Sequence, residues 1–146
     1  MTSLSTKTEE TKDFLTHTLT LDIQIFDTDC FGVMWHGAYI KWLELGRVKL
    51  MEERGIKLSK PGDKAGYIYP VVDQHLRFKA PGDYQDNLTL TTTLEIKGGK
   101  LIFHQDFYSE KRERNTLEAV TTVMVCDMDW KLQRRVPDTL LEKLKA

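Results

Sequence analysis

The sequence has few cysteines and no long apolar segment, and both deficits narrow the classes of protein to consider. Cys30 and Cys126 are the only cysteines among 146 residues, which is too few for a secreted disulfide framework. No segment is apolar over the length of a membrane-spanning helix, and the polar first residues do not resemble a signal peptide. We therefore expect a cytoplasmic protein with reduced thiols and no membrane insertion.

The sequence also lacks an excess of acidic or basic residues, since its formal net charge is -1 at pH 7. Nucleic-acid binding usually requires a basic excess, so we expect no nucleic-acid partner. The HExxH, CxxC, GxSxG, P-loop and GxGxxG motifs are absent from the sequence. These absences leave no support for a metal ion or a cofactor, and we expect neither.

The residues that are present suit one globular domain. Hydrophobic residues make up 40% and charged residues 29% of the chain, and its length allows one hydrophobic core. Residues 1–14 are polar and charged, and we expect them to form a flexible tail. We expect residues 15–146 to form a single domain.

Apolar residues recur with strand and helix periods along this domain. Alternation with a period of two predicts strands over residues 17–26, 67–78, 88–97, 101–108 and 117–128. Helical spacing predicts a long helix over residues 37–54, ended by Gly55, and a short terminal helix over residues 137–144. Turn residues predict a loop at 59–66, a turn at Pro81-Gly82-Asp83 and a hairpin at Gly98-Gly99.

The order of these elements predicts an α+β fold. Short turns favour antiparallel neighbours, so we expect one five-stranded antiparallel sheet wrapped around the long helix. Pro70 is expected to place the start of its strand at a sheet edge or at a bulge. Since a single sheet leaves edges and one face uncovered, we expect a homodimer or a homotetramer.

Residues 26–39, between the first strand and the long helix, gather two carboxylates, a thiol, a histidine and two glycines. Asp27 and Asp29 would point to the same side of an extended chain. An aspartate here is either a turn or capping residue, or a general base or nucleophile beside a helix N-terminus. We assign the structural role to Asp27 and the catalytic role to Asp29.

The start of the predicted helix offers unpaired backbone N–H groups, and the N–H of His36 is among them. Such a group can stabilise a carbonyl oxygen that gains negative charge, although the His36 imidazole itself could simply meet solvent. Gly32 and Gly37 would let a ligand approach the backbone closely. Cys30 is interpreted as a small buried thiol, with a nucleophile activated by His36 as the alternative.

These residues form part of a longer motif that resembles a known family signature. The chain reads Asp27-Thr28-Asp29-x-x-Gly32-Val33-x-Trp35-His36-x-x-Tyr39, followed by Trp42-x-Glu44-x-x-Arg47. This motif resembles the hot-dog-fold acyl-CoA thioesterases, in the branch of 4-hydroxybenzoyl-CoA thioesterase and the Tol-Pal-associated thioesterases. The resemblance spans residues 18–127 and implies the hot-dog fold.

The resemblance also implies an activity. Asp29 would attack the thioester carbonyl of an acyl-CoA, or activate water to do so. The backbone N–H of His36 would polarise that carbonyl, and the His36 imidazole is a second candidate. The chain departs from the family at Cys30-Phe31, where small residues are usual, and at Gly46, where alanine is common. We therefore do not infer the acyl group of the substrate from any relative.

Binding residues follow from the same resemblance. Substrate contacts are expected from Gly32, Trp35, Gly37 and Tyr39. CoA carries phosphates, for which basic clusters are natural partners, although such clusters are more often solvated faces. The candidates are Arg112, Arg114, Arg134 and Arg135. Two alternatives to a thioesterase remain, namely a hydratase or dehydratase of the same fold and a non-catalytic acyl-CoA-binding module.

Overall fold

The computed structural model describes residues 15–57 and 66–145. The expected tail over residues 1–14 and nearly all of the expected loop at 59–66 lie outside these described residues. The helical elements are η1 (Ile25–Asp27), α2 (His36–Glu53) and α3 (Asp138–Leu144). The strands are β1 (Leu15–Asp22), β2 (Tyr67–Ile68), β3 (Val71–Phe78), β4 (Asn87–Lys97), β5 (Lys100–Ser109), β6 (Arg114–Met124) and β7 (Cys126–Asp127).

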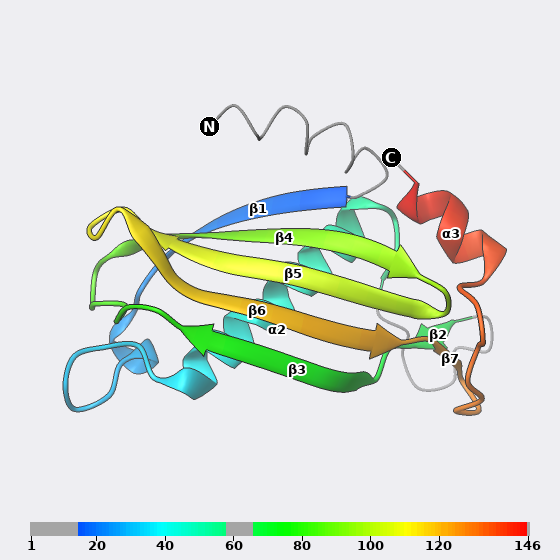
Figure 1. Cartoon of the computed structure of the whole chain (residues 1–146), viewed down its shortest axis with the longest axis horizontal. Coiled ribbons are helices and arrows are strands. Elements are labelled where there is room, and N and C mark those ends of the chain that lie inside the picture. The colour runs from blue at the N-terminus through cyan, green and yellow to red at the C-terminus, as the bar shows by residue number, and fades with distance from the viewer. Residues whose placement is uncertain (1–14, 58–65, 146) are drawn as a thin grey trace.

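Five strands form one antiparallel sheet in the order β1-β4-β5-β6-β3, which leaves β1 and β3 at its edges. Figure 1 shows these strands side by side with α2 crossing one face. The five-stranded antiparallel sheet around one long helix is confirmed. The Gly98-Gly99 turn between β4 and β5 is also confirmed, with Gly98 at a φ of 62°.

The first strand is shorter than its alternating pattern predicts. β1 ends at Asp22, which pairs with Asn87, the first residue of β4. Ile23 still exchanges backbone hydrogen bonds with Asp86 and Gln85, and the chain then turns into η1. Ile25 and Phe26 are therefore exposed rather than inward-facing, at 66% and 67% of their surface. The predicted strand over residues 17–26 is wrong beyond Asp22.

Helix α2 begins and ends close to its predicted bounds. Gly55 follows the helix at a φ of 77°, a left-handed conformation that favours glycine. Its N–H donates to Glu52 O, and the next N–H, from Ile56, reaches back to Met51 O. This pair of bonds is the Schellman arrangement, so the predicted helix end at Gly55 is confirmed.

Pro70 divides the second predicted strand. Tyr67–Ile68 forms β2, which pairs with β7 in a separate two-stranded sheet, whereas β3 begins at Val71 and lies at the edge of the main sheet. The register with β6 shifts between Val71 and Asp73, so the prediction of an edge and a bulge near Pro70 is confirmed. The last strand is likewise divided, because β6 starts earlier than predicted, at Arg114, and only Cys126–Asp127 continues as β7.

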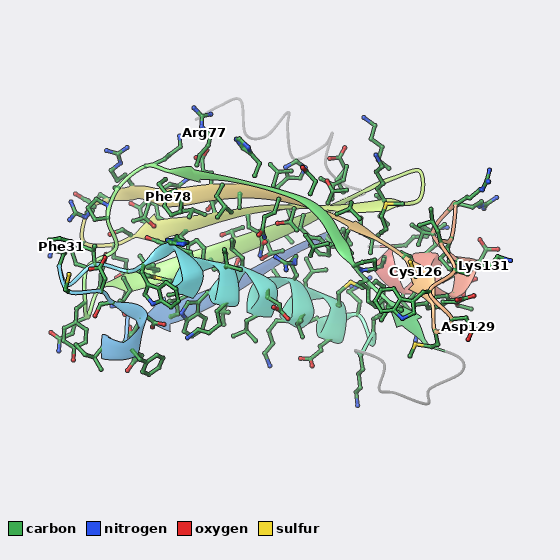
Figure 2. The ribbon with its side chains drawn as sticks, turned by 90° about the horizontal axis from the view of Figure 1, so that it is seen from below. Phe31, Arg77, Phe78, Cys126, Asp129 and Lys131 are labelled. Carbon is green, nitrogen blue, oxygen red and sulfur yellow. The ribbon has the colours of Figure 1, made fainter. Side chains whose placement is uncertain are left out.

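The core lies between α2 and the inner face of the sheet, where α2 packs mainly against β1 and β4. Figure 2 shows α2 on one side of the sheet, with Phe31 and Phe78 at one end of the molecule and Cys126 and Lys131 at the other. One core cluster, which includes Met34 and Leu43, supports the end that carries residues 26–39. Among the described residues, no helix has the length and apolar character needed to cross a membrane.

Candidate active site

The chain between η1 and α2 folds into a small closed hairpin, residues 27–35. The N–H of Trp35 donates to Asp27 O at 3.1 Å, and the N–H of Asp29 donates to Val33 O at 3.0 Å. Gly32 closes the turn at a φ of 75°, and a Cβ built there would meet no atom within 4 Å. The hairpin therefore joins Asp27 to the residue before α2, carries Asp29 on its first arm and leaves open space at Gly32.

The carboxylate of Asp27 is fully buried and fully occupied. Oδ2 accepts the backbone N–H of Gln24 at 3.0 Å. Oδ1 accepts Lys41 Nζ at 3.1 Å and Trp42 Nε1 at 3.3 Å, both from α2. Asp27 therefore fastens the turn before the hairpin to the helix after it. These contacts confirm the structural role predicted for this residue.

Asp29 is exposed, and one of its oxygens is already positioned by the backbone. Oδ1 accepts the N–H of Phe31 at 2.9 Å, and the N–H of Gly32 donates to Asp29 O at 3.0 Å. This Asx turn fixes the direction of the carboxylate without burying it. No contact among the described residues uses Oδ2, so this oxygen remains available to a ligand or to water.

The helix start beside this carboxylate has no side-chain cap. Trp35 is the N-cap residue and makes no capping hydrogen bond. The N–H groups of Ala38 and Tyr39 donate to Trp35 O, but those of His36 and Gly37 have no acceptor within the described residues. Two donors at the positive end of the α2 dipole thus remain free. The His36 side chain is exposed, and its ring meets the Trp35 ring edge-on at 6.0 Å.

Two predicted substrate contacts have surroundings that the sequence did not show. At Gly37 the side-chain space is filled, although its backbone N–H has no acceptor among the described residues. A Cβ on this residue would lie 2.0 Å from the Trp35 ring, so the indole, and not a ligand, occupies the space that glycine leaves. Tyr39 is only 1% exposed and packs edge-on against Phe107 at 5.0 Å. Because it belongs to the core, Tyr39 cannot touch a substrate in this structure. Burial raises the pKa of its hydroxyl, and the nearby Thr116 opposes that shift.

The alternative roles of Cys30 also change. The thiol is exposed, so the interpretation as a small buried residue is wrong. No contact joins the thiol to His36 among the described residues. The alternative role of Cys30, as a nucleophile activated by His36, therefore gains no support. No group of three His, Cys, Asp or Glu side chains within the described residues could hold a metal ion.

A second loop supports the hairpin, and the sequence indicated only that it turns. The N–H of Met34 donates to Gly82 O at 2.7 Å, and Val33 forms a β-bridge with Asp83. The Asp83 carboxylate accepts Lys111 Nζ and Arg112 Nη2, each at 2.9 Å. The hydrogen bond from Lys111 and the charge of Arg112 lower the pKa of Asp83, although partial burial opposes them.

The four candidate arginines do not lie together. Arg112 and Arg114 are at the β5–β6 turn, which contacts the hairpin through Asp83. Arg134 lies beside the β4–β5 turn, because a Cβ on Gly99 would meet Arg134 O at 2.4 Å. β4 spans 11 residues between those two ends, which is about 33 Å. Arg134 and Arg135 are therefore remote from Asp29 in the same chain.

A buried polar side chain on β5 was also missed. Gln105 is only 3% exposed and lies on the inner face between Phe103 and Phe107. Its Nε2 donates to Leu43 O and to Thr92 Oγ1, each at 2.9 Å. The sequence signal was present, because an amide in the apolar phase of an alternating strand needs partners inside the fold.

The sheet around α2, with a free carboxylate at the helix start, defines the hot-dog fold and a site suited to carbonyl chemistry. The chain belongs to the thioesterase-like superfamily, whose model matches residues 23–144. This match confirms the hot-dog thioesterase resemblance. The assignment to the Tol-Pal-associated branch stays a prediction.

Individual relatives agree with this membership. The Bacillus subtilis protein YneP, described as a candidate acyl-CoA thioesterase, is 27% identical over 131 residues that cover 86% of this chain and 94% of YneP. The Synechocystis protein sll0410, described as a candidate esterase, is 30% identical over 124 residues that cover 84% of this chain and 74% of sll0410. An aspartate-to-asparagine variant of 4-hydroxybenzoyl-CoA thioesterase, solved with 4-hydroxybenzoyl-CoA, superposes with a TM-score of 0.75 at 18% identity. That comparison covers 89% of this chain and 99% of the other.

Proposed function

We propose that this protein hydrolyses an acyl-CoA thioester to the free acid and CoA. The observation that carries the proposal is the pairing of one oriented, exposed carboxylate, Asp29, with the uncapped start of α2. A thioester carbonyl is already electrophilic and has a good leaving group. One base or nucleophile with one oxyanion donor is therefore enough, and no triad is required.

In this proposal the carbonyl oxygen accepts the backbone N–H of His36, with the Gly37 N–H as its neighbour. The helix dipole stabilises the negative charge that develops on that oxygen. Asp29 attacks the carbonyl carbon as a nucleophile, or its free Oδ2 takes a proton from an attacking water. The CoA thiolate leaves in either route. In the nucleophilic route the acyl group is then held on Asp29 as a mixed anhydride, which water hydrolyses to release the free acid and restore the carboxylate. The exposed His36 imidazole is a second candidate to assist the reaction.

The test is a panel of acyl-CoA thioesters with thiol release as the readout. Wild type is expected to cleave at least one of them, and Asp29→Asn is expected to lose roughly 10²–10⁴-fold in kcat. His36→Ala keeps the backbone N–H and is expected to lose far less. A wild type that cleaves no acyl-CoA, or an Asp29→Asn variant with an unchanged rate, would reject the proposal.

The same panel separates the two alternatives. A hydratase or dehydratase would change the mass of an enoyl-CoA by one water and leave the thioester intact. A binding module would retain acyl-CoA, release no thiol and behave identically in the Asp29→Asn variant. The membership of the thioesterase-like superfamily favours hydrolysis over both.

We further propose that the active form is a homodimer or a homotetramer in the cytoplasm. Both cysteines are unpaired, which suits a reducing compartment. The edge strand β3 supports assembly, because Val72 and Phe78 on it are 55% and 56% exposed. Arg112 and Arg114 are the proposed CoA-phosphate ligands from the chain that supplies Asp29. Arg134 and Arg135 could reach a bound CoA only from another copy.

A further inference from the structure

Lys111 and Arg112, at the β5–β6 turn, are two neighbouring cations that converge on one carboxylate oxygen. Lys111 Nζ and Arg112 Nη2 each lie 2.9 Å from Asp83 Oδ2, and Arg112 Nη2 also donates to Oδ1 at 3.2 Å. Two like charges this close to each other repel unless an anion lies between them. Asp83 is therefore the anion that the chain itself places in a two-cation site.

A second aspartate fixes the backbone of this turn, so the turn does not depend on Asp83 for its conformation. Asp86 is buried, and its Oδ2 accepts the Ser109 hydroxyl. Its Oδ1 accepts the backbone N–H of Lys111 at 3.2 Å, and Ser109 Oγ accepts the backbone N–H of Arg112 at 3.0 Å. The fold thus presents the two cations side by side whether or not the Asp83 carboxylate lies between them.

The two cations lie beside the hairpin that carries the proposed catalytic carboxylate. The N–H of Tyr84 donates to Gly32 O at 3.2 Å, and Val33 forms a β-bridge with Asp83. These contacts hold the Asp83 loop directly against the hairpin. The side chain of Lys111 is 63% exposed, so an anion from solvent can reach the pair.

We propose that Lys111 and Arg112 form a phosphate-binding site that Asp83 occupies in the free protein, and that a phosphate group of CoA displaces this carboxylate. The inference rests on the proposed function, because CoA is the ligand that it names. It adds Lys111 to the binding residues and makes Asp83 an internal competitor of the substrate.

The chemistry of the two side chains favours this exchange of anions. A lysine carries three donors and an arginine five, and the single Asp83 carboxylate leaves several of them unused. A phosphate monoester offers three oxygens and a charge of about −1.5 to −2 at pH 7, so it can accept from both cations at once. Because the Asp83 ion pairs are partly exposed, breaking them costs little.

The experiment measures CoA binding to the full chain by titration calorimetry. Asp83→Asn removes the competing charge and is expected to bind CoA roughly three- to tenfold more tightly than wild type, because no ion pair must first be broken. Lys111→Ala keeps the competitor and removes one cation, so it is expected to bind CoA more weakly by a similar factor. In a variant that combines Asp83→Asn with Lys111→Ala and Arg112→Ala, the gain should disappear. Pantetheine, which has no phosphate, should not distinguish any of these variants.

A matched control removes one carboxylate from an ion pair at the other end of α2. Glu52 pairs with Lys49 at 3.5 Å, so Glu52→Gln makes the same change in net charge and is expected to bind CoA as wild type does. Circular dichroism reports the folding of each variant. If Asp83→Asn is unfolded, Lys111→Ala decides, because it leaves the loop carboxylate in place.

The inference is overturned by an Asp83→Asn variant that is folded but binds CoA no more tightly than wild type, or by a gain that persists without the two cations. A Lys111→Ala variant that binds CoA as wild type does would also overturn it, and so would the absence of CoA binding in both wild type and Asp83→Asn. A chain that follows the expected pattern of CoA binding but cleaves no acyl-CoA would reject the proposed function and leave this inference standing.

Discussion

Asp27 and Asp29 lie two residues apart in one hairpin, and their carboxylates have opposite surroundings. Three donors hold the buried carboxylate of Asp27, whereas one oxygen of Asp29 faces outward. The same substitution at the two positions should therefore affect different properties. We expect stability to depend on Asp27 and, under the proposed function, turnover to depend on Asp29.

We predict that Asp27→Asn lowers the free energy of unfolding by about 2–3 kcal/mol, because it leaves Lys41 and a buried amide donor poorly paired. Asp29→Asn should change the free energy of unfolding by no more than about 0.5 kcal/mol, since the side chain is exposed. Urea denaturation of the two variants measures both values. Equal losses of stability at the two positions would contradict this division of roles.

Substitution of Gly46, which lies on the face of α2 that contacts the sheet, is also expected to change stability. A Cβ there would lie 2.8 Å from Leu90 Cδ2, 2.8 Å from Thr92 Oγ1 and 2.9 Å from Gln105 Nε2. Gly46→Ala gains about 1 kcal/mol of helix propensity but overpacks the helix–sheet contact at a cost of about 1–3 kcal/mol. We predict a net loss of stability by chemical denaturation. Lys49→Ala, on the exposed side of α2, is the control and should be nearly neutral.

Some features of individual residues could be predicted from the sequence, and others could not. The sequence placed the start of α2 correctly, because short-range spacing determines it, and the catalytic role of Asp29 stays a prediction. The motif assigned Tyr39 to the substrate, although Tyr39 faces the sheet and packs in the core between Phe78 and Phe107. Gly37 was interpreted as room for a ligand, because no pattern in the sequence shows that the Trp35 ring folds back over it.

At the scale of an element, the turn after β7 carries local strain. Trp130 has a φ of 63° and is 69% exposed. The Asp127 carboxylate holds this turn, accepting the N–H groups of Asp129 and Lys131 at 2.9 Å each. The left-handed conformation costs an L-residue roughly 1–2 kcal/mol, whereas glycine adopts it freely.

We predict that Trp130→Gly raises the free energy of unfolding by roughly 0.5 kcal/mol, after the entropy cost of glycine in the unfolded chain is subtracted. Trp130→Ala keeps a Cβ and should show no such gain. Thermal and urea unfolding of both variants provide the comparison. A glycine variant less stable than the alanine variant would mean that the turn does not strain residue 130.

The ion pairs of Asp83 with Lys111 and Arg112 should make the stability of the loop that supports the hairpin depend on pH. The lowered pKa of Asp83 means that the folded state favours the charged carboxylate. This stabilisation is complete above the unfolded value of about 3.9 and is lost as the pH falls toward the lower folded value. We predict that Asp83→Asn is less stable than wild type at pH 7, and that the difference shrinks as the pH falls below the unfolded value of about 3.9.

Urea denaturation of Asp83→Asn and wild type between pH 2 and pH 7 measures this difference in the free energy of unfolding. Asp129 is an exposed carboxylate that forms no salt bridge within the described residues, so Asp129→Asn serves as the control and should parallel wild type. A stability gap between Asp83→Asn and wild type that stays constant across the acid range would contradict the assignment.

Strands were predicted well where both neighbours exist and poorly where pairing ends. β4 and β5 match their alternating patterns, because each is central and one face of each is buried. The pattern at Ile23 and Ile25 continues past the last partner of β1, and alternation alone cannot show where a neighbour stops. The division at Pro70 was foreseen only as an edge or bulge, since the pairing of β2 with β7 joins residues far apart in the sequence.

At the scale of the whole molecule, the basic residues define two opposite ends. We predict that Arg112→Ala with Arg114→Ala raises KM for an acyl-CoA several-fold and leaves kcat nearly unchanged. The double variant should not affect an N-acetylcysteamine thioester, which has no phosphates to bind. Steady-state kinetics with the two substrates measure this contrast.

The matched comparison is Arg134→Ala with Arg135→Ala at the far end of the sheet. An increase in KM only in this second pair would show that another copy supplies the phosphate ligands. An equal effect on both thioesters would instead indicate a general structural loss. The separation of the arginines by the length of β4 could not be predicted from the sequence, because it depends on which strands become neighbours.

The closed hairpin over residues 27–35 has an evolutionary consequence. Its own backbone bonds, and the Asp27 anchor to α2, set the direction of Asp29. The side chains of Cys30 and Phe31 project from its tip, and Phe31 is 84% exposed. Residues at the tip can therefore change through mutation while the carboxylate keeps its orientation. If the proposed function holds, descendants of this chain could acquire new acyl preferences while Asp29 and the start of α2 stay as they are.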